Sequence, residues 1–271
     1  MIEYNEKWIL KVNSLRELGT PETQDMVLHG LCVAGTCSFS FNGVKYNLKA
    51  GSLFIVRQSN LVLDLQCSDD FEFEGLWFDV KFIRLSASKS RYIIRHILLL
   101  YANPVLHLNT EEIELWKRNY EAILFRIEAA HHSFRCELIM SSLWQLCLDC
   151  FYFTSRAYGF EEISSLYYAV VNQFFEMLEN KEYRKNRSLT YYAEKLCVTP
   201  KHLSAMVKRV SGSGAMFWIT HFTIIELQVL LRTSSRTVNE LANQFNFSSV
   251  SHFTRYVQTN LGINPTDLRE A

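Results

Sequence analysis

The chain has 271 residues, 48% of them hydrophobic, so it can bury a sizeable core and is not a disordered polymer. Its formal net charge is zero, but residues 181–271 carry 12 Lys and Arg against 6 Asp and Glu, whereas residues 1–180 carry 16 against 22. An acidic front and a basic tail indicate that a polyanionic partner would meet only the tail; a chance imbalance on solvated faces is the alternative.

The seven cysteines are an odd number and have neither the spacing of a secreted disulfide framework nor that of a zinc site. Cys147 and Cys150 form a C-x-x-C pair within an apolar run, where packing in a core is the simpler interpretation. No N-terminal stretch has the form of a signal peptide, and no apolar run reaches the roughly 18 residues of a membrane span. We therefore expect a cytoplasmic chain with reduced cysteines and no membrane partner.

Residues 27–80 show the short alternating runs of an antiparallel β-domain. In the stretch TCSFSFNGVKYNLKAG, two such runs flank Asn42-Gly43, the pair best suited to the tight turn of a hairpin. Cys37, Phe39 and Phe41 would share one face of the first run, because side chains alternate along a strand. We expect a small antiparallel barrel or sandwich, followed by helices from residue 90 onward.

A barrel of this kind raises the question of a ligand or a metal in its mouth. A metal site on strands needs clustered His and carboxylate ligands, and His29 stands alone, so we expect no metal and no cofactor. An apolar ligand pocket is one interpretation of the aromatic residues in these strands, and plain core packing is the other. The pocket would be lined by Phe39, Phe41, Phe54, Trp77 and Phe78.

Three helical stripes follow, with apolar residues at the i, i+3, i+4, i+7 spacing. The first is Ile113, Trp116, Tyr120, Ile123, Leu124 and Ile127, the second is Leu138, Ile139, Leu143, Leu146 and Cys150, and the third is Ile163, Leu166, Tyr167, Val170, Val171, Phe174, Phe175 and Leu178. Each helix must bury its apolar side, so a homodimer seam within residues 90–160 is the alternative to packing in the chain's own core.

Beyond a charged joint at residues 179–188, one short helix is predicted to end at Leu196 and another to begin after a bend. Thr199 offers an N-cap oxygen, and Pro200 follows at the first helical position, where its missing N–H costs nothing. Gly212 ends this second helix. Its inner stripe consists of Leu203, Met206, Val207 and Val210.

The same order returns later in the chain. A helix over residues 238–245 is followed by a bend at Asn246 and Phe247, and Asn tolerates the left-handed backbone that such a corner needs. The N-cap of the next helix is Ser248 or Ser249. Its inward residues are Phe253, Tyr256 and Val257, and its stop is Gly262.

The spacing of matching residues locates a difference between the two units. Ala193 and Ala242 lie 49 residues apart, whereas Gly212 and Gly262 lie 50 apart, so the second bend carries one extra residue. Residues 215–233, with Ser213 as their expected cap, read as one long helix that joins the units.

A helix, a sharp turn and a capped second helix describe a helix-turn-helix, whose second helix can lie in the major groove of DNA. The chain has two of these in one basic segment, with recognition helices at residues 200–210 and 249–259. We therefore expect a sequence-specific DNA-binding transcription regulator that enters successive major grooves of double-stranded DNA.

The tail, from about residue 170, resembles the DNA-binding domain of the AraC/XylS family of bacterial transcription regulators. The matching stretches are YYAEKLCVTPKHLSAMVKRVSG, VLLRTSSRTVNELANQFNFSSVSHFTRY and the ending LGINPTDLR. The resemblance implies a two-domain α+β chain, with a cupin-like sensing domain over residues 1–160 and an all-α DNA-binding domain over residues 161–271. It also implies a small-molecule effector of the N-terminal domain.

The family's base-reading positions fall on seven residues of this chain. In the first recognition helix they are Lys201, Ser204 and Ala205, and in the second they are Val250, Ser251, Thr254 and Arg255. Arg255 could donate two hydrogen bonds to guanine, whereas Ala205 and Val250 offer only apolar contact. The residues expected to meet phosphates are Lys195, Lys208, Arg209 and Arg236.

Four positions depart from the family pattern. Thr223 and Leu227 stand in the joining helix where Arg and Ala are common, and Asn246 stands where Gly is usual. Gln258 replaces the usual Lys, which removes one phosphate contact. None of these positions is among the groove-facing residues.

The alternative function is a cupin-like small-molecule-binding protein or enzyme whose helical tail binds other proteins. The sequence contains no G-x-S-x-G, no P-loop and no cluster of His and carboxylates. We therefore expect that the protein is not an enzyme.

Overall fold

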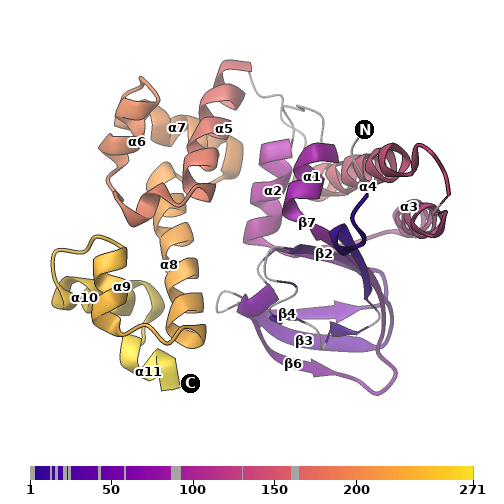
Figure 1. Ribbon diagram of the computed structural model, residues 1–271, viewed down its shortest axis with the longest axis horizontal. Coiled ribbons are helices and arrows are strands. Elements are labelled where there is room, and N and C mark those ends of the chain that lie inside the picture. Colours follow the sequence, from indigo (N-terminus) through magenta and orange to yellow (C-terminus); the bar gives the residue numbers. More distant parts are fainter. Residues whose placement is uncertain are drawn as a thin grey trace. The chain divides into compact units, whose positions relative to one another are not determined.

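The computed structural model describes residues 4–12, 14–15, 18–20, 23, 26–41, 44–57, 59–86, 93–129, 131–159 and 165–270. The chain divides into two compact units, Met1–Glu162 and Ile163–Ala271. An antiparallel β-domain with helices forms the first unit and helices alone form the second, which confirms the predicted fold class (Figure 1).

The strands of the first unit are β1 (Ile9–Val12), β2 (Met26–Ala34), β3 (Thr36–Phe41), β4 (Val44–Lys49), β5 (Ser52–Val56), β6 (Val62–Cys67), β7 (Glu72–Asp79) and β8 (Val105–His107). Its helices are α1 (Val80–Ser86), α2 (Ile93–Ala102), α3 (Thr110–Glu128) and α4 (Arg135–Tyr158). The helices of the second unit are α5 (Ser165–Glu179), α6 (Leu189–Lys195), α7 (Pro200–Ser211), α8 (Ala215–Thr233), α9 (Val238–Gln244), α10 (Val250–Leu261) and α11 (Pro265–Glu270), with a 3₁₀ turn η5 (Glu182–Arg184) after α5.

Two antiparallel sheets build the β-domain. The larger has the strand order β1-β7-β2-β5-β8, and the smaller has the order β4-β3-β6. On β3, Cys37, Phe39 and Phe41 are buried while Ser38 and Ser40 are half-buried, which confirms the predicted face. The Asn42-Gly43 turn lies outside the described residues.

The larger sheet is covered on both faces, so its strands are apolar on both sides. On one face, Leu76 and Phe78 pack in a core with Trp116 of α3 and Leu143 of α4. On the other, the ring of Phe54 lies 4.9 Å from that of Phe39 in the smaller sheet, measured between centroids. Every residue of the first two predicted helical stripes except Leu138 belongs to this core or packs against it.

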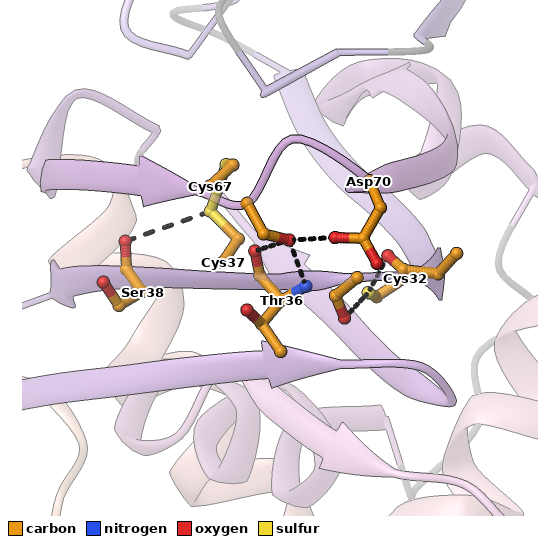
Figure 2. The surroundings of a disulfide bond; sticks show 9 residues. Cys32, Thr36, Cys37, Ser38, Cys67 and Asp70 are labelled. Atoms are coloured by element: carbon orange, nitrogen blue, oxygen red, sulfur yellow. Dashed lines mark hydrogen bonds between the residues drawn. A yellow bond between two sulfur atoms is a disulfide. The ribbon is translucent and has the colours of Figure 1, made fainter.

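A disulfide between Cys37 and Cys67 joins β3 to β6 (Figure 2). The expectation that all cysteines are reduced was therefore wrong for this pair. The two residues are register partners in neighbouring antiparallel strands, with 4.0 Å between their Cα atoms. Their separation of 30 residues in sequence hides this pairing, because only the fold brings the strands together.

His29 of β2 is buried against α4, where its Nδ1 lies 4.0 Å from the Cys150 sulfur. Burial lowers the pKa of His29 to about 4, so the ring is neutral at pH 7. Burial also raises the pKa of Cys147 to about 12 and that of Cys150 well above its ordinary value. The C-x-x-C pair is therefore part of the core, as its apolar surroundings indicated.

The second unit has its own aromatic core. Phe174 and Phe175 of α5 contact Tyr192 of α6 and Trp218 of α8, with centroid distances of 5.5 and 5.3 Å respectively. Val171, Phe174, Phe175 and Leu178 of the third predicted stripe are buried, and Ile163 lies outside the described residues. Within the described part of the chain no single helix is long and apolar enough to cross a membrane; α7 and α8 pass that test only as a pair, bent by 72°.

Candidate nucleic-acid interface

The first helix-turn-helix consists of α6, a corner and α7. Leu196 caps α6 at its C-terminus, and Cys197 turns the chain in the left-handed region with φ of 54°. The Thr199 hydroxyl accepts a hydrogen bond from the His202 N–H at 3.2 Å, and Pro200 occupies the first turn. Gly212 ends α7 with φ of 81°, a conformation open to glycine at no steric cost. The predicted start and stop of this helix are confirmed.

The second motif, made of α9 and α10, is built the same way. Phe245 caps α9, Asn246 takes the left-handed corner with φ of 51°, and the Ser249 hydroxyl caps α10 through the His252 N–H at 3.1 Å. Of the two serines considered for this cap, Ser249 is therefore the one used. Gly262 ends α10 with φ of 71°.

Equivalent backbone bonds show where the two motifs differ. The Val198 N–H donates to the Ala193 carbonyl at 3.0 Å, and the Phe247 N–H donates to the Ala242 carbonyl at 2.9 Å. The two motifs therefore match as far as their corners. The extra residue of the second motif lies between its corner and the N-cap of α10.

Helix α8 joins the two motifs over its predicted length, residues 215–233. Helices α5–α7 lie around its first part and α9–α11 around its last part (Figure 1). Its N-cap is Gly214, which corrects the expected cap at Ser213; the Ser211 hydroxyl instead closes this turn by accepting from the Trp218 indole at 2.7 Å. A buried helix thus carries both recognition helices.

The seven predicted base-contacting residues lie on the outer sides of α7 and α10. Five are exposed and two, Ser204 and Thr254, are half-buried. The exposed residues are Lys201, Ala205, Val250, Ser251 and Arg255. The inner sides are closed by Leu203, Met206 and Val207 in α7 and by Phe253 and Val257 in α10.

Ser204 also lies against Gly214, a contact that the sequence did not indicate. A Cβ added at Gly214 would lie 2.9 Å from the Ser204 hydroxyl oxygen, so this serine packs against the turn between α7 and α8. Ser204 is therefore more constrained than Lys201 or Ala205.

The predicted phosphate-contacting residues differ in their present partners. Lys208 and Arg209 are exposed, and the Arg209 guanidinium lies 5.8 Å from the centroid of the Tyr167 ring. Arg236 donates to the Gln244 side chain at 2.6 Å. Lys195 pairs with Glu182 at 3.1 Å, and hydrogen bonds to Tyr191 and then to Glu182 raise the pKa of Lys195. Lys195 would have to leave Glu182 to reach a phosphate.

Two exposed histidines occupy matching positions that the sequence analysis did not single out. His202 and His252 are each the third residue after an N-cap, and each donates its backbone N–H to that cap. The His252 ring nitrogen Nδ1 is 3.1 Å from the Ser248 hydroxyl. His202 follows Thr199, and His252 follows Ser249, by the same three residues in sequence. This shared spacing is the signal that could have identified them.

The five aromatic residues proposed for a ligand pocket do not converge on one cavity. All five are buried, and Trp77 and Phe78 are neighbours on β7, so their side chains point to opposite faces of the sheet. Phe78 belongs to the core under α3 and α4, whereas Phe39 and Phe54 fill the space between the sheets. Core packing accounts for these residues. Among the described residues, no group of three or more His, Cys, Asp and Glu side chains is placed to hold a metal.

Comparisons with known proteins agree with the architecture of the second unit. Residues 192–271 match a family model described as a helix-turn-helix domain. No curated protein matches the chain.

Solved structures with some likeness were also found. The C-terminal domain of the two-component response regulator yesN from Fusobacterium nucleatum is 23% identical and covers 36% of this chain and 95% of its own, with a TM-score of 0.34. ToxT from Vibrio cholerae is 12% identical over 91% of this chain and 90% of its own, with a TM-score of 0.43. The DNA-binding domain of AdpA, solved with a target DNA, is 21% identical over 40% of this chain and 92% of its own, with a TM-score of 0.33.

The fold and the family match define a DNA-binding transcription regulator of the helix-turn-helix class. The resemblance of its C-terminal domain to the AraC/XylS family is confirmed, and that domain is a helix-turn-helix domain of the AraC/XylS type.

Proposed function

We propose that α7 and α10 enter successive major grooves on one face of a DNA duplex and read its bases. The observation that carries this proposal is the pair of matching capped helices joined by α8, whose 19 residues span about 28 Å at 1.5 Å per residue. That length is close to one turn of the duplex, about 34 Å.

The proposed roles follow from the chemistry of each side chain. Lys201 and Arg255 donate hydrogen bonds to guanine, Ser204, Ser251 and Thr254 bond to several bases, and Ala205 and Val250 contact apolar base edges. Lys195, Lys208, Arg209 and Arg236 bind phosphates and supply affinity without sequence choice.

The test begins with duplexes that the full chain recovers from a random library. With the recovered duplex, Arg255→Ala is expected to weaken binding by about 1–3 kcal/mol and to relax the choice of base at one position. Lys208→Ala should weaken binding to all sequences alike and reduce the salt dependence. Arg118 lies in the first unit and its side chain is 75% exposed, so Arg118→Ala is the control. This substitution should leave the affinity, the choice of base and the salt dependence unchanged.

Fluorescence anisotropy over a range of salt concentrations measures these affinities. Equal affinity for the recovered duplex and a scrambled one, unchanged by Arg255→Ala, would contradict sequence-specific binding.

We also propose a homodimer whose seam lies on α4. Leu148 and Tyr152 are four residues apart on one side of this helix and are 44% and 57% exposed, which is unusual for large apolar side chains in neighbouring positions. Sedimentation of the full chain tests this proposal. The double substitution Leu148→Glu and Tyr152→Glu should shift a dimer to monomer. If the chain without substitutions is a monomer at all concentrations, the seam is contradicted.

The proposal includes an effector of the first unit, which can act only by favouring one of two arrangements that differ in DNA affinity. Because the aromatic side chains between the sheets are buried, a ligand there would have to displace them. Identical DNA binding by the separated second unit and the full chain under every condition would refute such coupling.

A further inference from the structure

Arg187 contacts the second helix-turn-helix although it lies just before the first one in sequence. Its guanidinium Nη1 donates to the carbonyl of Phe245, and Nη2 lies 3.4 Å from the carbonyl of Asn246. Nη1 also donates to the Tyr183 carbonyl at 3.1 Å, within its own segment. One side chain therefore joins residues 181–188 to the corner of the second motif.

The two carbonyls that Arg187 binds belong to the end of α9 and to the left-handed corner. Carbonyls at a helix C-terminus have no partner within the helix and carry partial negative charge, so a cation placed there is favourable. The Arg187 guanidinium also lies 3.9 Å from the centroid of the Phe247 ring, the first residue after the corner. Phe247 in turn packs against Phe253 of α10, with 5.3 Å between ring centroids.

Further contacts attach the same segment to this corner. The Asn246 side chain donates to the Lys185 carbonyl at 2.9 Å, and the Arg184 guanidinium lies 5.6 Å from the centroid of the Phe245 ring. The corner and residues 181–188 therefore each contribute side chains to the contact between them.

The segment itself is fixed to the joining helix. Glu226 of α8 accepts hydrogen bonds from Lys181 at 2.7 Å, from the Tyr183 hydroxyl at 3.0 Å and from Arg184 Nε at 2.9 Å. Ser188, the residue after Arg187, is the N-cap of α6. Arg187 thus stands between α6 of the first motif and the corner that leads into α10.

We propose that Arg187 is a positioning residue that sets the place of α10 relative to α7. It thereby sets the spacing that the protein accepts between two DNA boxes, which are the two stretches of base pairs contacted by α7 and by α10. This inference rests on the proposed function. Arginine suits the role because its planar fork binds two carbonyls while its flat face stacks on an aromatic ring, whereas the ammonium group of lysine is a compact point charge without a fork or a flat face.

The test uses the full chain and a duplex recovered from a random library by the unaltered protein. Versions of this duplex have one or two base pairs added or removed between the two protected boxes. Changing the spacing is expected to weaken binding of the unaltered chain about tenfold or more. Arg187→Ala should weaken binding to the recovered duplex while reducing the penalty for altered spacing to about threefold or less.

Arg187→Lys keeps the charge and is expected to resemble Arg187→Ala in its tolerance of spacing. Arg118→Ala is the control that removes one arginine outside this unit and should keep the full penalty. Circular dichroism reports whether each variant is folded, and if Arg187→Ala is not folded, Arg187→Lys decides.

A uniform loss of affinity for every spacing, with the unaltered preference retained, would mean that Arg187 only stabilises the domain and would overturn the inference. Retention of the full spacing penalty by Arg187→Lys would overturn it as well. If the unaltered chain recovers no preferred duplex, it is the proposed function that fails.

Discussion

The two left-handed corners differ in how well their residues suit that backbone. Asn246 tolerates it and uses its side chain to bind the Lys185 carbonyl, whereas Cys197 is an exposed, unbranched thiol with φ of 54°. A left-handed backbone costs a residue with a Cβ about 1–2 kcal/mol, and glycine escapes this cost.

Cys197→Gly is therefore expected to stabilise the second unit by about 0.5–1 kcal/mol, after the greater freedom of glycine in the unfolded chain is subtracted. Urea denaturation measures the gain as a higher midpoint, with an unchanged slope of the unfolding free energy against urea concentration. Asn246→Gly is the matched comparison and should gain less, because it also loses the bond to Lys185. A loss of stability in Cys197→Gly would contradict this account of the corner.

His29 makes the stability of the first unit depend on pH. Burial lowers the pKa of His29 from 6.5 to about 4, so below pH 6.5 the unfolded chain gains a proton that the folded chain does not take up until about pH 4. Stability should therefore fall as the pH drops from 6.5 to 4, by up to about 3 kcal/mol for this residue.

Replacing His29 with Leu should flatten that pH dependence without abolishing it, because burial also lowers the pKa of His96 to about 4. Denaturant midpoints between pH 7 and pH 4 measure the effect. The same slope in His29→Leu and in the unaltered chain would show that His29 is not the cause.

At the scale of elements, the sequence predicted those whose signals are local. Thr199, Pro200 and Gly212 fix both ends of α7, and the run from Ala215 to Thr233 is α8 from end to end. The N-cap of α8 was misplaced by one residue because a buried serine, Ser211, meets the Trp218 indole. That contact depends on packing and not on the pattern of residues.

Elements joined over long distances could not be predicted in the same way. Alternation indicated strands, but the pairing of Met26 on β2 with Asp79 on β7 and of Phe54 on β5 with Val105 on β8 is set by tertiary packing. The same reason explains why the partner of Cys37 and the role of Arg187 were missed. In the candidate site, helical period places the seven residues opposite the core, but their selection as base contacts is what the family resemblance implies, because period alone does not tell which outward side chains meet a base.

The disulfide between β3 and β6 gives a prediction for these elements. It closes a loop of 30 residues, and in the chain-entropy account a crosslink of that length stabilises by about 3–4 kcal/mol. Dithiothreitol should therefore lower the melting temperature of the first unit, and Cys67→Ser should show the lower value with or without the reductant. A melting temperature that neither treatment changes would contradict this contribution.

At the scale of the whole molecule, the charge division and the two motifs support one account. The unit that carries both recognition helices has 12 Lys and Arg against 8 Asp and Glu, whereas the other unit has 16 against 20. A neutral protein can therefore still bind a polyanion through one of its units. The central claim is that α7 and α10 both reach the bases of one duplex.

Photo-crosslinking tests that claim most directly. A benzophenone amino acid is placed at Ala205 of α7 or at Val250 of α10 in the full chain, and the nucleotides that it crosslinks in the recovered duplex are mapped. The account predicts two clusters of crosslinks, about 10 base pairs apart on one face of the duplex, one from each position. Crosslinks from only one of the two positions, or from both to the same base pairs, would contradict it.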